Sequence, residues 1–69
     1  MQHAFQFYRR PDMEHPIFTK CEDSGPEAVS GRAKHLLREL NHGQDFVVVR
    51  RAPDLKEVFR CAIEDGQQP

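Results

Sequence analysis

Two stretches of this sequence resemble each other, and a proline in the first limits what both can form. Residues 9–18 read RRPDMEHPIF and residues 50–59 read RRAPDLKEVF. Alone, the second predicts a helix over 54–64, because Asp54 and Glu57 have capping-box spacing ahead of an apolar stripe. The first cannot be helical, since Pro16 lacks an N–H donor and its ring opposes a preceding helical turn. If the two stretches share a structure, both belong to β-hairpins.

The similarity extends over residues 7–25 and 48–66, with one-residue shifts. Each segment has two apolar residues, two arginines, a Pro-Asp pair, an apolar residue followed by Phe, and Glu-Asp ahead of a glycine. This repeat favours a strand over 57–64, and the alternative is the C-terminal helix over 54–64. It also gives Cys21 and Cys61 similar positions, which would let them lie side by side in the sheet and form a disulfide under oxidising conditions.

The other elements follow from periodicity. Alternating aromatics predict a strand over 3–9, β-forming residues predict one over 17–22, and consecutive valines predict one over 45–51. Residues 24–42 predict a helix from about 25 to 42, with Ser24 and Glu27 as a capping box and Gly43 as the C′ residue. Its apolar residues recur at helical spacing and form one stripe: Val29, Ala33, Leu36, Leu37 and Leu40.

These elements predict an α+β fold with the order ββαββ. One helix on one face of an antiparallel sheet makes a two-layer domain. The expected core contains Phe5, Phe7, the helix stripe, the valines, and Phe59 or Ile63. If 54–64 were helical instead, the order would be ββαβα with a three-stranded sheet.

Length and composition predict a single small domain over 1–69, with a flexible tail at 65–69. The net charge of −1 gives no overall attraction to nucleic acid or to an anionic membrane. With two cysteines, no signal peptide and no long apolar run, we expect a soluble cytoplasmic protein with reduced thiols.

No pattern predicts a catalytic, cofactor-binding or metal-binding site, so we expect a protein that is not an enzyme. The histidines and cysteines lack the short ligand spacings of zinc sites. Cys21 precedes the helix, but Glu22 and Asp23 would oppose a reactive thiolate. The carboxylates lie at strand ends and turns, where solvation explains them, and the four glycines are isolated rather than clustered in a phosphate loop.

The basic residues are the strongest candidates for binding a partner, because they lie in or beside strands. We predict partner contacts for Tyr8, Arg9, Arg10, Lys20, Arg50, Arg51 and Arg60. Of these, Tyr8, Lys20, Arg50 and Arg60 are expected on the sheet face that the helix leaves open. Arginines beside an aromatic suit a single-stranded nucleic acid. Two acidic groups lie apart, one at 22–27 and one at 64–65, and segregated charge suits docking on a protein.

The order of elements across residues 3–64 resembles that of several small phage-encoded inhibitor proteins, including anti-CRISPR proteins. The resemblance carries no functional residue. It implies a non-enzymatic protein that binds a larger protein or protein–nucleic-acid complex and inhibits or regulates it. The alternative hypothesis is a nucleic-acid-binding domain that uses the strand arginines. An exposed sheet edge could also pair two copies into a homodimer, and no membrane contact is expected.

Overall fold

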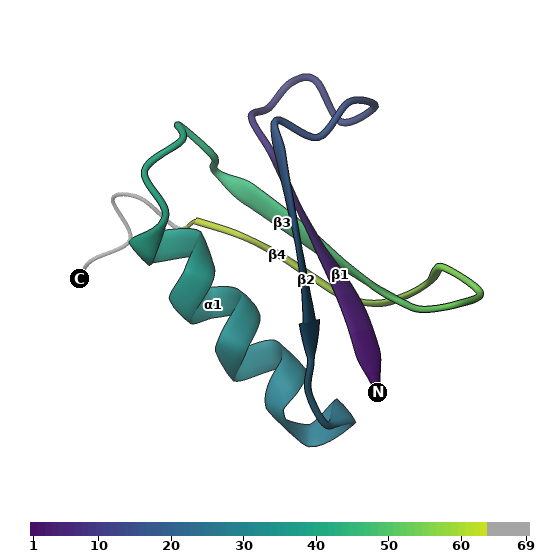
Figure 1. Cartoon of the computed structure of the whole chain (residues 1–69). Coiled ribbons are helices and arrows are strands. Elements are labelled where there is room, and N and C mark those ends of the chain that lie inside the picture. The colour runs from purple at the N-terminus through teal and green to yellow at the C-terminus, as the bar shows by residue number, and fades with distance from the viewer. Residues whose placement is uncertain (64–69) are drawn as a thin grey trace.

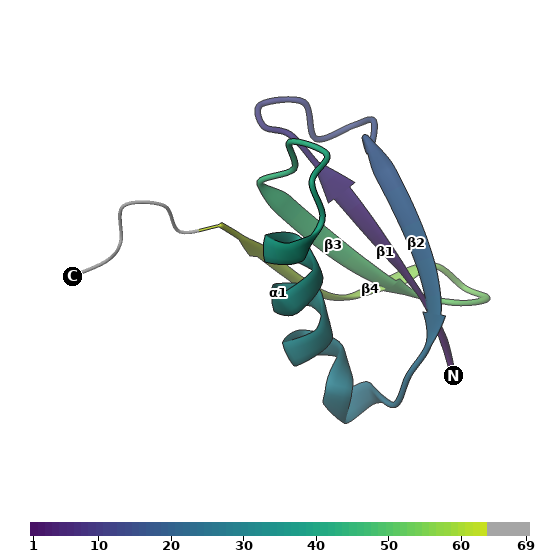
Figure 2. The same cartoon turned by 60° about the vertical axis from the view of Figure 1, so that its left-hand side comes forward.

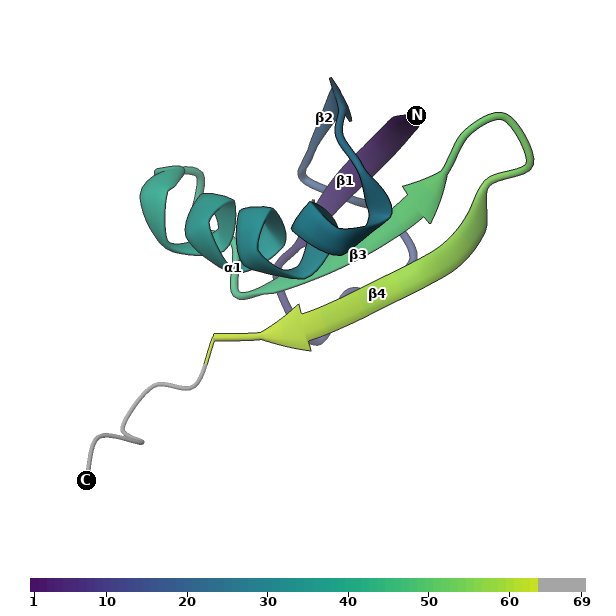
Figure 3. The same ribbon diagram turned by 90° about the horizontal axis from the view of Figure 1, so that it is seen from below.

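The structure, a computed structural model, describes residues 1–63 and confirms the ββαββ order (Figure 1). Strands β1 (Gln2–Tyr8) and β2 (Phe18–Asp23) form the first hairpin. A 3₁₀ turn, η1 (Pro26–Ala28), leads into helix α1 (Val29–Glu39). Strands β3 (Phe46–Arg51) and β4 (Lys56–Ala62) form the second hairpin, and the two strands lie side by side in Figure 3. Residues 65–69, predicted as a tail, and Glu64, predicted in the last strand, lie outside the described residues.

The two hairpins meet through their inner strands. The strand order is β2-β1-β3-β4 and all pairs are antiparallel. Phe5 lies opposite Lys20 on one side and Val49 on the other, so these three side chains share one sheet face. The outermost strands of the sheet are therefore β2 and β4.

Helix α1 covers one face of the sheet and closes the core (Figure 2). It packs mainly on β3 and β4, while β2 forms the edge of the sheet farther from the helix. The core is contributed equally by sheet and helix, and each of its residues is at most 5% exposed. Its members are Phe5, Phe7, Val47 and Val49 from the sheet, and Val29, Ala33, Leu36 and Leu37 from the helix.

The last segment is a strand, as the repeat predicts, and the alternative C-terminal helix is wrong. Phe59 lies opposite Val49 and Cys61 lies opposite Val47, so both side chains pack against the core. The alternation along the strand packs Phe59, Cys61 and Ile63 against the core, whereas Leu55 and Val58, which a helix would have placed on its apolar stripe, are exposed. The register shifts once, between Val49 and Arg50, where Val58 forms a bulge.

The repeat correctly predicts that both segments form hairpins, but equivalent residues of the two segments do not lie on the same face of the sheet. Phe7 faces α1, whereas its counterpart Val48 faces the other side, because side chains alternate along a strand. The prediction that Cys21 and Cys61 could lie side by side in the sheet is wrong. They lie in the two outermost strands, β2 and β4. Three strand spacings separate these strands, which places them about 14 Å apart. They also point to opposite faces, because Cys21 is opposite Ala4 while Cys61 is opposite Val47.

The helix is shorter at both ends than predicted. The capping box does not form: α1 starts after η1, and Ser24 Oγ is buried without a hydrogen-bond partner among residues 1–63. At the other end, Leu40 is already extended, so Gly43 is not the C′ residue. The buried side chain of Gln44 takes over that role, because its Nε2 donates to the carbonyls of Leu37 and Leu40 at 2.9 and 2.6 Å.

Candidate binding face on the open side of the sheet

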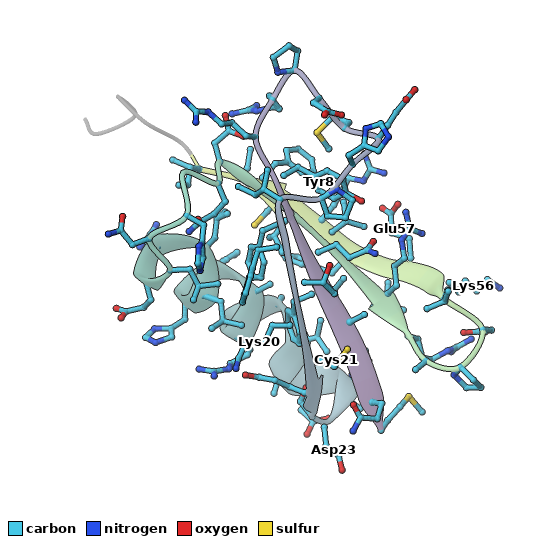
Figure 4. All side chains as sticks on the ribbon, turned by 45° about the horizontal axis from the view of Figure 1, so that its top comes forward. Tyr8, Lys20, Cys21, Asp23, Lys56 and Glu57 are labelled. Atoms are coloured by element: carbon cyan, nitrogen blue, oxygen red, sulfur yellow. The ribbon has the colours of Figure 1, made fainter. Side chains whose placement is uncertain are left out.

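The sheet face opposite α1 is open, since no helix or strand of the described residues lies over it. We call it the open face. The alternation of the strands assigns to it Ala4, Gln6, Tyr8, Thr19, Cys21, Phe46, Val48, Arg50, Glu57 and Arg60. Figure 4 shows Tyr8 and Glu57 on the same side of the sheet.

A polar network stabilises the middle of the open face. Tyr8 is 5% exposed, and its hydroxyl donates to Gln6 Oε1 at 3.3 Å. Arg50 Nε donates to the same oxygen at 2.9 Å, and Arg50 Nη1 reaches the carbonyl of Leu55 at 3.3 Å. Tyr8 is thus buried within this face, and the Arg50 guanidinium is hydrogen-bonded both to Gln6 of β1 and to the turn between β3 and β4.

Phe46 is the centre of the strongest feature of the open face. Its half-buried ring lies opposite Tyr8, and the guanidinium carbons of Arg10 and Arg60 lie 5.7 and 5.8 Å from the ring centroid. Cations at this distance are attracted to the π face of an aromatic ring. We refer to Tyr8, Arg10, Phe46 and Arg60 as the open-face cluster.

Carboxylates hold both arginines of the open-face cluster in place. Asp45 accepts a hydrogen bond from the Arg10 backbone N–H at 2.9 Å, and its second oxygen lies 3.4 Å from Arg10 Nε. Glu57 binds Arg60 through two hydrogen bonds of 2.6 and 2.7 Å. These bonds lower the pKa of Glu57 and raise the pKa of Arg60, so the pair stays ionised at neutral pH.

The structure separates the remaining predicted residues from this cluster. Lys20, predicted on the open face, is on the helix face, because it lies opposite Phe5; its ammonium is 3.6 Å from Glu22 (Figure 4). Arg51 lies opposite His3, also on the helix face, and binds Asp54 at 2.7 Å. That contact raises the pKa of Arg51 and lowers the pKa of Asp54. Arg9 is in the first hairpin loop, with its guanidinium close to Gly43.

Sequence reasoning missed Phe46, which the structure places at the centre of the candidate site. A signal for it exists: Phe46 precedes three valines, and parity along that strand puts it with Val48 and Arg50. His3 was also missed. Its side chain is 2% exposed on the helix face, and its Nδ1 is buried without a hydrogen-bond partner in the described part of the chain.

The acidic residues near the start of the helix are also paired. Glu22 accepts two hydrogen bonds of 2.7 Å from Arg32, which lower the pKa of the Glu22 carboxyl. Asp23 binds the N-terminal ammonium at 2.6 Å, and that contact lowers the pKa of Asp23. Glu22 and Asp23 of the predicted acidic group are thus each paired with a positive charge, and the second group at 64–65 lies outside the described residues.

A cavity of about 170 Å³ lies between α1 and β4. Pockets for small molecules usually measure about 300–1,000 Å³. The lining includes the bases Lys34 and Arg38 and the apolar residues Leu37, Ala62 and Ile63, beside Cys61. Within residues 1–63, no three His, Cys, Asp or Glu side chains gather where they could hold a metal ion. In the same range, no helix is long and apolar enough to cross a membrane.

Comparison of the chain with protein-family models, curated proteins and solved structures finds no match. The chemistry of the open face is therefore argued from its own geometry: an aromatic ring with two guanidinium groups 5.7 and 5.8 Å from its centroid, on a sheet face that no helix or strand of residues 1–63 covers.

Proposed function

We propose that this protein is a non-enzymatic protein-binding module that docks on a larger protein or protein–nucleic-acid complex through the open face and acts as a small inhibitor or regulator. The observation that carries the proposal is the open-face cluster. Aromatic residues and arginine are enriched in the cores of protein interfaces and dominate their binding energy. Here Phe46 and two arginines lie together on a surface that no helix or strand of residues 1–63 covers.

Preorganisation supports the same proposal. Ordering a long side chain on binding costs about 0.5–1.5 kcal/mol. Asp45 and Glu57 already restrain Arg10 and Arg60 in the free protein, so less of this cost falls on association. Phe46 and Tyr8 are anchored by the central strands, which keeps the apolar part of the surface rigid.

A nucleic acid is the second candidate, and Arg50 is the residue that favours it. Within residues 1–63, Arg50 makes no ion pair of its own, although it lies opposite Glu57, whose pKa is lowered first by Arg60 and also by the charge of Arg50. Phosphate binding draws on uncompensated positive charge. Four of the predicted basic residues, Arg10, Lys20, Arg51 and Arg60, instead have a carboxylate oxygen within 4 Å. The local charge balance favours a protein partner.

The test compares two double variants with the same change in charge. Arg10→Glu with Arg60→Glu alters the open-face cluster, and Lys34→Glu with Arg38→Glu alters exposed bases of α1. Each chain is immobilised, and bound bacterial proteins are identified by mass spectrometry. We expect a specific partner with the wild type and the helix variant, and its loss with the open-face variant.

The recovered partner is then purified and titrated by calorimetry against all three chains, with folding checked by circular dichroism. Loss of heat for the open-face variant alone supports the proposal. Equal binding by all three chains contradicts it. A parallel gel-shift series with single-stranded DNA and RNA is run over increasing salt. Binding to naked nucleic acid that weakens steeply with salt would select the alternative.

A further inference from the structure

The outer edge of β2 exposes backbone groups that are available for pairing. The carbonyls of Met1 and Phe7 accept hydrogen bonds from the N–H groups of Ser24 and Ile17. The odd-numbered residues of β1 therefore direct their backbone N–H and C=O groups towards β2. Backbone polar groups alternate sides along an antiparallel strand. Ser24, Glu22 and Lys20 therefore direct their N–H and C=O groups inward. Thr19, Cys21 and Asp23 direct theirs to the outside of the sheet.

The other edge, β4, is protected in one way that β2 is not. The bulge at Val58 interrupts its register with β3. Bulges are a usual means by which proteins prevent edge pairing. By contrast, the β1–β2 register runs continuously from Gln2 opposite Asp23 to Phe7 opposite Phe18.

The sequence of β2 is complementary to itself in one antiparallel register. In a two-fold pair, opposite residues share a face, so their numbers differ by an even amount. With Cys21 opposite Cys21 of a second copy, Lys20 lies opposite Glu22 twice, and Thr19 lies opposite Asp23 twice. Moving the centre to Lys20 or to Glu22 would place two like charges opposite each other, which destabilises a strand pair.

We propose that two copies of this chain pair antiparallel through the outer edges of β2, with the two Cys21 residues at the two-fold axis. Cys21 and Asp23 are exposed on that edge in the single chain (Figure 4). Lys20 and Glu22 occupy the closely spaced positions of the new pair, where Cα atoms lie about 4.5 Å apart. This dimer does not depend on the open-face function, and it places both open faces on the same side of one continuous sheet.

The charged pairs have a fixed starting geometry. Arg32 holds Glu22 with two hydrogen bonds of 2.7 Å, and the Glu22 side chain is 19% exposed. Lys20 lies 3.6 Å from Glu22 and keeps 39% of its side-chain surface in water. The lysine can therefore reach the carboxylate of the second copy without breaking the Glu22–Arg32 contact.

Sedimentation equilibrium of the reduced full chain tests the association from micromolar to millimolar concentrations. We expect reversible dimerisation in the wild type. Thr19→Pro removes an outward N–H without loss of a hydrogen bond inside the chain, and proline is tolerated at strand edges. It should abolish the dimer, whereas Thr19→Ala, which keeps the N–H, should not. Lys20→Glu should weaken the dimer by about tenfold or more.

Thiol trapping tests the register. Diamide oxidises two thiols to a disulfide and takes up their two hydrogens, being reduced to the hydrazine. We expect Cys61→Ala, which keeps Cys21, to give covalent dimer much faster than Cys21→Ser, which keeps Cys61. Thr19→Pro should slow this trapping, and dispersed amide spectra confirm that each variant is folded. A monomer at every concentration, equal trapping of both cysteine variants, or a dimer that survives Thr19→Pro in a folded chain would each overturn the proposal.

Discussion

At the scale of single residues, Leu55 occupies a backbone conformation that glycine prefers. Its φ is 58°, in the left-handed region, where a side chain with a Cβ costs about 1–2 kcal/mol. The Leu55 side chain is 56% exposed, so it returns little packing energy for that conformation. The conformation closes the turn between β3 and β4, where Leu55 N–H donates to the Arg51 carbonyl at 2.6 Å.

Leu55→Gly should therefore stabilise the protein by about 0.5–1 kcal/mol, after the greater chain entropy of glycine in the unfolded state is subtracted. Urea denaturation measures the change. Leu55→Ala keeps the Cβ and is the matched control, with an expected change of less than about 0.5 kcal/mol. A loss of stability in the glycine variant would contradict this account of the turn.

The contact between Glu22 and Arg32 predicts a dependence of stability on pH. Hydrogen bonds from Arg32 lower the pKa of Glu22 below its ordinary value of 4.5 in the folded state. The contact therefore stabilises the fold fully above that value, and the stabilisation is lost as pH falls through the lower, folded-state pKa. Arg32 retains 39% of its side-chain surface in water, so solvent screening limits the contribution to about 1 kcal/mol.

Glu22→Gln should lower the free energy of unfolding by about 1 kcal/mol at pH 7, and by progressively less as pH falls below about 4. Denaturation curves at a series of pH values measure this difference. Glu39→Gln removes an exposed carboxylate from α1 and serves as the control. A difference between wild type and Glu22→Gln that stays constant down to pH 2 would exclude the proposed linkage.

At the scale of elements, periodicity located the first three strands and the helix, and the repeat located β4, but neither located the helix ends. The apolar stripe of α1 packs on the sheet as expected, because burial of one face decides the position of an amphipathic helix. The ends depend on single contacts: Gln44, in the loop that follows the helix, caps the carbonyls of Leu37 and Leu40. In the predicted capping box, the Ser24 N–H would donate to the side chain of Glu27. In the structure it donates to the Met1 carbonyl instead, next to the end of β2.

Leu37→Ala should cost about 2–5 kcal/mol, because Leu37 is 3% exposed and packs between α1 and the sheet. Leu55→Ala, at an exposed position, shows how much an alanine costs outside the core. Urea or thermal denaturation distinguishes the two. An unchanged midpoint for Leu37→Ala would mean that the helix stripe does not form the core.

The repeat shows which part of the candidate site is predictable. Comparison of the two stretches identified β4 as a strand, since Pro16 excludes a helix from the first. It could not assign faces, because a one-residue shift moves a side chain to the other side of a strand. Lys20 was therefore predicted on the same face as Arg60, whereas the two lie on opposite faces of the sheet. Parity along the strand groups Phe46 with Arg50, but its position beside Tyr8 depends on the pairing of β1 with β3.

At the scale of the whole molecule, the fold depends on one long-range strand pair. The inner strands β1 and β3 join the two hairpins, and both contribute to the core. The outer strands are paired on one side only. Stability should therefore decrease from the middle of the sheet outwards.

Amide hydrogen exchange of the dilute protein should show this gradient. We expect the slowest exchange in β1 and β3 and fast exchange at Thr19 and Cys21, whose N–H groups point away from the sheet. Nuclear magnetic resonance measures each amide separately. Protection of Thr19 and Cys21 equal to that of β1 in dilute solution would contradict the assigned edge.

The chain contains one tyrosine and no tryptophan, and that tyrosine, Tyr8, lies beneath the open face next to Phe46. The intrinsic ultraviolet emission of the protein therefore originates from the candidate binding surface itself. A partner that covers Phe46 and displaces Arg10 or Arg60 changes the surroundings of this single fluorophore. The native protein thus carries its own optical reporter of occupancy, and binding can be followed without attaching a dye.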